Sequence, residues 1–381
     1  MSLELTFTGA QVLLPGQGLV EAEVSIADGV ISEGAGRKVN LDGYLVLPGI
    51  VDLHGDGFER HLAPRRGAMK QMDEGVIATE AELAANGITT AVMAQFWSWE
   101  GGVRGPDYAA QVFAAIARMR ARVVTDLLPQ LRFETHMLED YDALPERLAD
   151  WGVSYLVFND HLPHDRLAAG RTPPRLTGQA LKARRNPEAH LALLQQLHEN
   201  GAKVPAALDR ICEILRAQGV VLGSHDDQSA QDRADWRARG ARIAEFPETI
   251  EAAEAAKAAG DPVILGAPNV VRGGSHKGNA SALDLISMGL CEAIASDYHY
   301  PSPRRAALML ARSGVLDFAS SWDLISSGPA RVLGLEDRGA LAPGKRADLV
   351  VLEAESHRVA LTLAGGRVSY MNGAIAERLL R

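Results

Sequence analysis

The feature that most constrains the fold of this chain is a series of eight short apolar runs, most of them separated by segments of helical composition. Short apolar runs rich in β-branched residues are typical of buried strands, and Ala-, Leu-, Arg- and Glu-rich segments favour helices. The predicted strands are Leu47–Leu53, Ile88–Ala94, Asp126–Phe133, Ser154–Phe158, Val220–Gly223, Arg242–Phe246, Pro262–Leu265 and Glu292–Ala295. The helical segments between them include Ala78–Asn86, Tyr108–Arg120, Pro205–Gln218, Ile250–Ala259 and Ala280–Met288.

Eight strand–helix units in roughly 250–300 residues predict a closed (β/α)8 barrel of the TIM type. An open, doubly wound parallel sheet is the alternative. It is less favoured because neither a glycine-rich dinucleotide fingerprint nor a P-loop follows the first predicted strand. The sequence therefore predicts an α/β protein whose barrel spans residues 47–339.

The two ends of the chain share a different pattern, in which short strands alternate with glycine turns. The predicted strands are Leu3–Phe7, Gln11–Leu14, Glu21–Ile26, Val30–Ile31 and Tyr44–Val46 near the N-terminus, and Ala347–Leu352, Arg358–Leu363 and Arg367–Met371 near the C-terminus. Because two strand-rich ends flank the barrel pattern, residues 1–46 and 340–381 are expected to form one small β-sandwich domain.

Composition excludes several classes of protein. The chain is 47% hydrophobic and 23% charged, which is ordinary for a globular protein. Its formal net charge of −9 argues against non-specific binding to nucleic acid. Two cysteines, Cys212 and Cys291, cannot build a disulfide framework, and no apolar stretch has the length of a membrane span. A cytoplasmic protein without a nucleic-acid or membrane partner is expected, and a homo-oligomer stays open.

Metal-binding side chains follow five of the eight predicted strands. His54 and Asp56 come directly after the first run and face the same side, because strand side chains repeat every second residue. The other strand ends are Arg132-Phe133-Glu134-Thr135-His136, Asn159-Asp160-His161, Ser224-His225-Asp226-Asp227 and Ser296-Asp297-Tyr298-His299. Each alone fits an exposed loop histidine or a helix-capping aspartate. Together they predict an active site, because polar residues at the carboxyl ends of barrel strands meet at one face.

Imidazole and carboxylate groups suit one or two divalent transition-metal ions, with zinc favoured and iron or manganese as alternatives. Glu134 is the candidate bridging carboxylate, since no predicted strand end offers a lysine that could be carbamylated in its place. The candidate ligands of one ion are His54, Asp56 and Asp297, and those of the other are His161 and His225. Such ions lower the pKa of bound water and polarise the electrophile. Asp297 is also the candidate catalytic base that accepts the proton of the attacking water.

The remaining histidines fall into two groups. Three lie in charged helical or terminal segments and are expected to be solvated: His190, His198 and His357. Five lie near the predicted mouth, where supporting or substrate-binding roles are as plausible as no role: His61, His136, His164, His276 and His299.

A glycine-rich segment after the seventh predicted strand has the composition of an anion-binding loop. Its glycines free the backbone N–H groups to turn inward, and its cationic and polar side chains suit phosphate or carboxylate. The candidate substrate-binding residues in this loop are Asn269, Arg272, Ser275, His276 and Lys277. Arg65, after the first strand, is a further anion-binding candidate. The alternative is a glycine-rich connection that only packs over the barrel.

The run Leu47–His54, Asp297 and the segment Gly344–Val350 resemble the amidohydrolase superfamily. The resemblance implies a distorted (β/α)8 barrel, a flanking β-sandwich built from both termini, and one or two divalent metals. Most members carry H-x-H on the first strand, whereas this chain has His54-Gly55-Asp56.

Within the superfamily, the chain resembles the PhnM branch, the diphosphatases of phosphonate metabolism. Matching stretches cover nearly the whole sequence, and they include Gly87–Thr90, Leu222–Asp227, Ile243–Pro247, Gly266–Asn279 and Ser296–Tyr298. The resemblance implies hydrolysis of a ribose 1-alkylphosphonate 5-triphosphate, an anionic small molecule, with release of diphosphate.

Two loops differ from the pattern of this branch. Trp97 and Trp99 stand after the second strand, where small residues are expected, and Leu162–Leu181 also departs. Loops at a barrel mouth select the substrate, so Trp97 is a further candidate substrate contact. The alternative function is therefore hydrolysis or deamination at carbon, acting on a small amide, a cyclic imide or an amino-substituted acid. A catalytically inactive barrel acting as a scaffold is a third hypothesis, which the complete ligand set disfavours.

Overall fold

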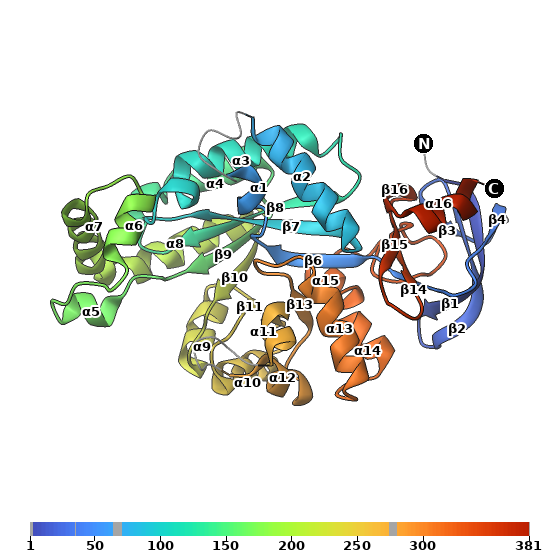
Figure 1. Cartoon of the computed structure of the whole chain (residues 1–381). Helices are drawn as coiled ribbons and strands as arrows, with labels where there is room; N and C mark the ends of the chain where they lie inside the picture. The colour runs from blue at the N-terminus through green and yellow to red at the C-terminus, as the bar shows by residue number, and fades with distance from the viewer. Residues whose placement is uncertain (1–2, 35, 64–70, 274–279, 381) are drawn as a thin grey trace. The chain divides into compact units, whose positions relative to one another are not determined.

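The computed structural model describes residues 3–34, 36–63, 71–273 and 280–380 (Figure 1). Its strands form two sheets of eight strands each. The strands of the barrel sheet are β6 Ile50–Gly55, β7 Ile88–Trp97, β8 Asp126–Glu134, β9 Tyr155–Asn159, β10 Val221–His225, β11 Ile243–Glu245, β12 Val263–Gly266 and β13 Ala293–Ala295. They are parallel and follow one another in chain order, and each overlaps a predicted run. All eight predicted barrel strands are therefore confirmed.

Helices follow the barrel strands, as the alternating pattern predicts. In chain order they are α1 Glu59–Leu62, α2 Met72–Ala85, α3 Pro106–Met119, α4 Leu144–Trp151, α5 His164–Ala168, α6 Leu176–Lys182, α7 Pro187–Glu199, α8 Val204–Ala217, α9 Ala230–Ala238, α10 Ile250–Ala258, α11 Ala267–Arg272, α12 Ala282–Ser287, α13 Ser302–Arg312, α14 Phe318–Asp323, α15 Ser327–Val332 and α16 Gly373–Leu380. Three 3-10 turns accompany them, η1 Gly102–Arg104, η2 Leu138–Asp140 and η3 Asn200–Lys203. In the described ranges no helix combines the length and the apolar character that a membrane crossing requires.

The chain forms two compact units. Unit 1 comprises residues 1–93, 118–128 and 262–381, and unit 2 comprises residues 94–117 and 129–261. This division runs through the barrel pattern rather than along the predicted domain boundaries at residues 46/47 and 339/340, which stay a prediction.

Within unit 1, the last barrel strand pairs with the first. Gly55 forms a parallel bridge with Asp297, the Asp56 N–H donates to the Asp297 carbonyl (2.9 Å), and the Asp297 N–H donates to the His54 carbonyl (3.0 Å). A sheet of parallel strands in chain order whose first and last strands pair is a barrel. The predicted (β/α)8 fold class is confirmed.

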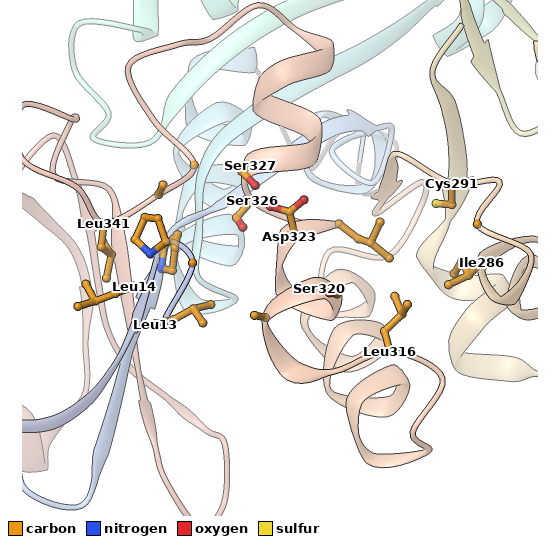
Figure 2. A pocket seen from close by; sticks show the side chains of 18 residues that line it. Leu13, Leu14, Ile286, Cys291, Leu316, Ser320, Asp323, Ser326, Ser327 and Leu341 are labelled. Atoms are coloured by element: carbon orange, nitrogen blue, oxygen red, sulfur yellow. The ribbon is translucent and has the colours of Figure 1, made fainter. Parts of the chain in front are cut away.

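A cavity of about 500 Å³ lies in unit 1 near Pro48, which precedes β6 (Figure 2). Leu13, Leu14 and Leu341 line one side, and Asp323 and Ser326 lie across from them. Barrel enzymes carry their active sites at the carboxyl ends of the strands. Because Pro48 stands at the amino end of β6, this cavity does not belong to the candidate site described below.

The second sheet combines both ends of the chain. Its strands are β1 Leu5–Leu14, β2 Gly18–Ala27, β3 Val30–Ser32, β4 Arg37–Asn40, β5 Tyr44–Pro48, β14 Leu349–Glu353, β15 Val359–Ala364 and β16 Arg367–Met371. Their order is β16-β15-β14-β5-β1-β2-β3, and β4 pairs with β1. The antiparallel pairing of β5 with β14 joins the N-terminal strands to the C-terminal ones.

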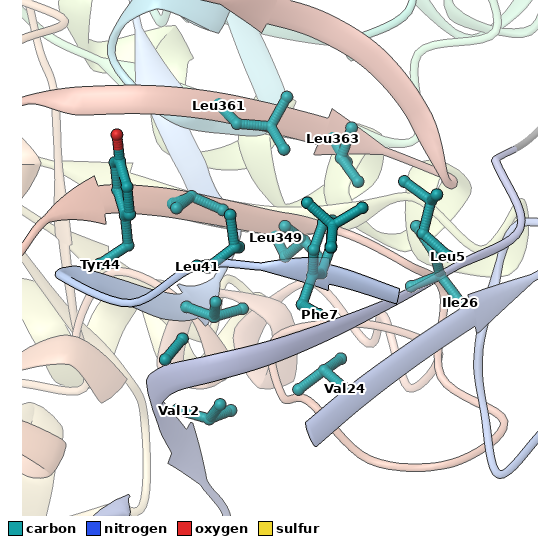
Figure 3. Close-up of a cluster of buried hydrophobic side chains, with 14 of the residues drawn as sticks. Leu5, Phe7, Val12, Val24, Ile26, Leu41, Tyr44, Leu349, Leu361 and Leu363 are labelled. Carbon is teal, nitrogen blue, oxygen red and sulfur yellow. The ribbon is translucent and has the colours of Figure 1, made fainter. Parts of the chain in front are cut away.

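The apolar core of this sheet contains side chains from both termini, among them Phe7, Ile26, Leu349 and Leu361 (Figure 3). Burial of a side chain of this size stabilises the folded state by about 1.5–3 kcal/mol. The predicted break between Leu3–Phe7 and Gln11–Leu14 is wrong, because β1 is continuous. Gly9 (φ +72°) allows a bulge there while the pairing with β2 continues on both sides.

A buried arginine holds several elements of unit 2 together. The Arg233 side chain on α9 is 2% exposed, and its guanidinium donates to Asp227 and to Asp261, each at 3.0 Å. A buried charge is tolerated only when it is paired, and removing one partner leaves the others uncompensated. Arg233 therefore links Asp227, in the loop after β10, to Asp261, two residues before β12.

We predict that Arg233→Ala lowers the free energy of unfolding by about 3–5 kcal/mol, because Asp227 stays buried without its cation, whereas Asp261 keeps its ion pairs with Arg237 and Arg242. Arg331→Ala is the matched control, since Arg331 forms an exposed ion pair with Asp323 at 2.9 Å, and it should cost at most about 1 kcal/mol. Urea unfolding of both variants checks the difference. Equal losses would contradict the assigned role of Arg233.

Candidate metal centre

Three predicted ligands lie where β6 and β13 pair in unit 1. The bridge between Gly55 and Asp297 brings Asp297 against the two residues that flank Gly55, namely His54 and Asp56. His54 is fully buried and Asp56 is half-buried. The structure therefore brings the three predicted ligands of unit 1 together through the backbone of the first and last barrel strands.

Gly55 is required by close packing at this junction. A Cβ atom on Gly55 would lie 2.8 Å from Asp52 Oδ2 and 2.9 Å from Ser296 Oγ. Asp52 accepts hydrogen bonds from the N–H (2.8 Å) and the hydroxyl of Ser296. Burial raises the pKa of Asp52 to about 6, and the hydrogen bonds from Ser296 oppose this shift. The hydrogen bonds between Asp52 and Ser296 thus join β6 to the segment after β13, next to His54 and Asp297.

The predicted ligands of unit 2 lie on the interior face of β8, β9 and β10. Gln130, Arg132 and Glu134 alternate along β8, so all three point to the same side. All three are at most 4% exposed. Buried polar residues at every second position indicate that this strand lines a polar interior rather than an apolar core.

Glu134 is the centre of a hydrogen-bonded group. Its carboxylate is fully buried, and it accepts from the indole N–H of Trp99 (3.2 Å), from the backbone N–H of His161 (3.1 Å) and from the imidazole of His161. Burial by itself would lower the pKa of His161, but the hydrogen bond and the charge of Glu134 outweigh it and raise that pKa. Glu134 therefore favours the protonated form of the His161 ring.

His225 and Asp226 complete the unit 2 cluster. Asp226 Oδ1 lies 3.1 Å from His225 Nδ1, and Asp226 Oδ2 lies 4.0 Å from His161 Nε2. The three residues each offer a ligand atom within 4.8 Å of the others. Arg132 donates to His225 Nε2 at 3.0 Å, and its guanidinium stacks on the ring of Phe96 at 3.9 Å. The Arg132 guanidinium thus lies against Nε2 of His225.

Sequence reasoning missed three residues of unit 2. Asp226 was assigned no role, although it stands next to His225. Arg132 and Glu245 were also overlooked; Glu245 is fully buried at the end of β11, beside His225 in the register, and accepts from Gln130 (2.9 Å) and Tyr155. The signal for Arg132 was the alternation of polar residues along β8.

Backbone strain marks the ends of three barrel strands. Asp226 directly follows β10 and has a φ angle of +60°. Phe246 directly follows β11 (φ +54°), and Asp297 is the second residue after β13 (φ +53°). Residues other than glycine rarely adopt these angles, and such strain concentrates at functional sites. Asp297 is itself a candidate ligand and Asp226 adjoins the candidate ligand His225, whereas β11 carries none of the predicted ligands.

The structure describes only three of the predicted substrate-binding residues, namely Trp97, Asn269 and Arg272. Arg65, Ser275, His276 and Lys277 lie outside the described residues. Trp97 is 1% exposed, and its indole donates to Asp140 at 2.7 Å. Arg272 is exposed, donates to Asn269 at 2.9 Å, and places its guanidinium 5.8 Å from the ring centre of Tyr298, the residue after Asp297. Of the predicted set, Arg272 and Asn269 lie beside the end of β13, and their roles stay predictions.

The other histidines take varied positions. His61 bonds to Glu82 at 2.6 Å, and His299 bonds to Ser302 at 2.7 Å. His190 is fully buried beside Trp99, so the expectation that it is solvated is wrong. Burial lowers the pKa of His190, with a contribution from Arg185. The sequence context of His190 does not reveal this, because α7 turns His190 inward together with Leu194.

Comparison with known proteins identifies the family. The sequence model of the amidohydrolase family matches residues 57–370, and the chain belongs to this family. The alpha-D-ribose 1-methylphosphonate 5-triphosphate diphosphatase of Escherichia coli (strain K12) is 32% identical over 330 residues, which cover 84% of this chain and 85% of that enzyme. The chain is therefore a hydrolase of the amidohydrolase superfamily and resembles the PhnM branch, as the sequence motifs indicate.

Solved structures share the fold at lower identity. A prolidase in complex with N-methylphosphonate-L-proline superposes with a TM-score of 0.62 and 14% identity, over 97% of this chain and 100% of that chain. The β-aspartyl dipeptidase of Fervidobacterium islandicum AW-1 has a TM-score of 0.60 and 15% identity, over 97% and 99%. At such identities the likeness establishes the fold alone.

The donor set fits divalent metal ions. Amidohydrolases generally use such ions, and the described residues include clusters of suitable ligands: His161, His225 and Asp226, and Glu100, Glu134 and His161. Imidazole nitrogen and carboxylate oxygen are ligands that zinc, iron and manganese accept. A buried carboxylate such as Glu134 also needs a positive partner, and an ion would supply one.

We predict that Glu134→Gln lowers the pKa of His161 in metal-free protein from above to below its ordinary value of about 6.5. The substitution removes the negative charge that favours the imidazolium, while the burial that opposes it remains. NMR titration of the His161 ring checks this, with Asp226→Asn as the control for the weaker and more distant charge. An unchanged pKa in Glu134→Gln would show that Glu134 does not set the protonation of His161.

Proposed function

We propose that this protein hydrolyses a ribose 1-alkylphosphonate 5-triphosphate and releases diphosphate. The observation that carries the proposal is the 32% identity to the Escherichia coli diphosphatase, because the match covers 84% of this chain and 85% of that enzyme. We place this reaction in the cytoplasm, in keeping with the free thiols of Cys212 and Cys291. The substrate is an anionic small molecule.

The proposed centre holds one or two divalent ions, zinc in the first place and iron or manganese as alternatives. Its ligands are the residues at the strand ends: His54, Asp56, Glu134, His161, His225 and Asp297. Support comes from the general rule that the carboxyl ends of barrel strands meet at one face, and from the separate groupings of these residues in unit 1 and in unit 2. Asp226 is a further candidate ligand.

Side chains of this protein have distinct tasks in the proposed reaction. When bound, the metal ions would activate water and withdraw charge from a phosphoryl oxygen. Asp297 accepts the proton of the attacking water, and the bond between the first and second phosphates breaks as diphosphate leaves. Arg132 and Arg272 provide positive charge for the substrate. Trp99 donates its indole N–H to Glu134 and thereby fixes a carboxylate that would hold the metal ions.

We predict that Asp297→Asn keeps most of the bound metal and lowers kcat by about 10²–10⁴-fold, because the amide retains one ligand oxygen but is not basic. Metal analysis and steady-state kinetics of the same preparation check both parts. A variant with more than about a tenth of the wild-type kcat would remove Asp297 from the role of proton acceptor.

We predict that Arg272→Ala raises KM for a triphosphate substrate by about tenfold or more and changes kcat little, because a contact of equal strength in the ground and transition states affects only binding. Arg367→Ala, an exposed arginine of β16, is the matched control. The assay compares sugar and nucleotide triphosphates with neutral amides and cyclic imides. Turnover of uncharged amides alone, insensitive to Arg272→Ala, would overturn the diphosphatase proposal and leave the metal centre in place.

A further inference from the structure

Three histidines and an aspartate form a second cluster in unit 2, outside the proposed ligand set. His136 lies in the turn after β8, Asp160 follows β9, His164 begins α5, and His198 lies in the last turn of α7. Helices α5 and α7 lie side by side (Figure 1). Below them, the side chains of Leu162, Leu167 and Leu194 pack into one apolar cluster with Trp99 and Leu176. The packing of the two helices therefore fixes the positions of His164 and His198.

The polar atoms of this cluster converge on the Asp160 carboxylate. His164 Nε2 lies 3.2 and 3.1 Å from its two oxygens, and His136 Nδ1 lies 3.5 Å from Oδ1. His136, Asp160 and His164 each offer a ligand atom within 4.8 Å of the others. Metal–nitrogen and metal–oxygen bonds of about 2.0–2.2 Å require ligand atoms about 3–4 Å apart. Small side-chain rotations are enough to reach that spacing.

His198 supports the ring of His164 from behind. The Nδ1 atoms of the two rings lie 2.8 Å apart, so a single hydrogen lies between them. When His164 carries that hydrogen, its Nε2 either carries a second hydrogen and donates to Asp160, or presents a lone pair that a cation between nitrogen and carboxylate would bind. When His198 carries it, His164 Nε2–H donates to Asp160. An imidazole whose second nitrogen is held by a partner is typical of metal-binding histidines.

The charges suit a cation better than an anion. Asp160 would repel a phosphate or carboxylate ligand. The Thr135 hydroxyl, 3.2 Å from His136 Nδ1, can rotate away from that nitrogen. His164 and Asp160 are partly exposed, which leaves a path for an ion from solvent.

We propose that His136, Asp160 and His164 bind an additional divalent transition-metal ion of the zinc type, with His198 orienting His164. Three protein ligands leave a position for water or another ligand, and imidazole nitrogen with carboxylate oxygen selects zinc and its neighbours over magnesium or calcium. The site joins the turn after β8, the loop after β9 and helix α5. It does not depend on the proposed reaction, because none of its residues belongs to the proposed catalytic centre.

Zinc-loaded, desalted holoenzyme is titrated with Zn²⁺ by calorimetry, and bound zinc is counted by mass spectrometry. Wild-type protein should take up one ion per chain more than His164→Ala, and His357→Ala, the matched histidine control, should behave like wild type. His198→Phe should bind this ion about 10–100-fold more weakly. Equal uptake by wild-type protein and His164→Ala, or no additional ion in either, would overturn the proposal.

A second variant covers the case in which His164→Ala fails to fold, which circular dichroism reveals. Asp160→Asn keeps the side-chain volume and removes the charge. Added Zn²⁺ should raise the thermal midpoint of the wild-type holoenzyme and not that of Asp160→Asn, because an ion that binds only folded protein stabilises it by mass action. An equal rise in both would contradict the site. Loss of hydrolase activity towards any substrate leaves these readouts unaffected, so the two proposals fail separately.

Discussion

The pairing of the last barrel strand with the first is the interaction on which the candidate centre depends. Two backbone hydrogen bonds join Asp297 to His54 and Asp56, residues about 240 positions away in the sequence. Asp52 and Ser296 secure the same junction with two further hydrogen bonds. A pairing at such separation must overcome the entropy of closing a long loop. The positions of the candidate ligands of unit 1 therefore depend on contacts between residues far apart in the sequence.

Burial of charge is the second constraint. Glu134 and Glu245 are fully buried, and Arg132 is nearly so, although isolated charges at such positions cost far more than ordinary core packing returns. Each is compensated locally, Glu134 by Trp99 and His161, Glu245 by Tyr155 and Gln130, and Arg132 by the ring of Phe96. Residues that do no more than support the fold would be apolar here. A site for metal ions and an anionic substrate requires buried polar side chains that are already held by hydrogen-bond partners.

Much of the fold and part of the site could be predicted from the sequence. The barrel strands could be predicted because a buried strand needs a short apolar run. The roles of His54, Glu134, His161, His225 and Asp297, which stand at or just after such runs, stay predictions. The bulge at Gly9 and the buried ring of His190 were missed, since pairing across a sheet and the facing of one helical residue depend on distant partners. Asp226 was missed for a related reason. Its neighbour Asp227 pairs with Arg233 on α9, whereas Asp226 has the positive φ of +60°. No local sequence pattern tells which of these two aspartates takes which position.

The central claim is that the strand-end histidines and carboxylates hold divalent metal ions. Anomalous diffraction from zinc-loaded crystals, measured on both sides of the zinc absorption edge, tests it most directly. The account predicts one or two anomalous peaks about 2.0–2.2 Å from ligand atoms of His54, Asp56, Glu134, His161, His225 and Asp297. Peaks elsewhere in the chain, with these six side chains ordered and none of them bonded to zinc, would contradict it.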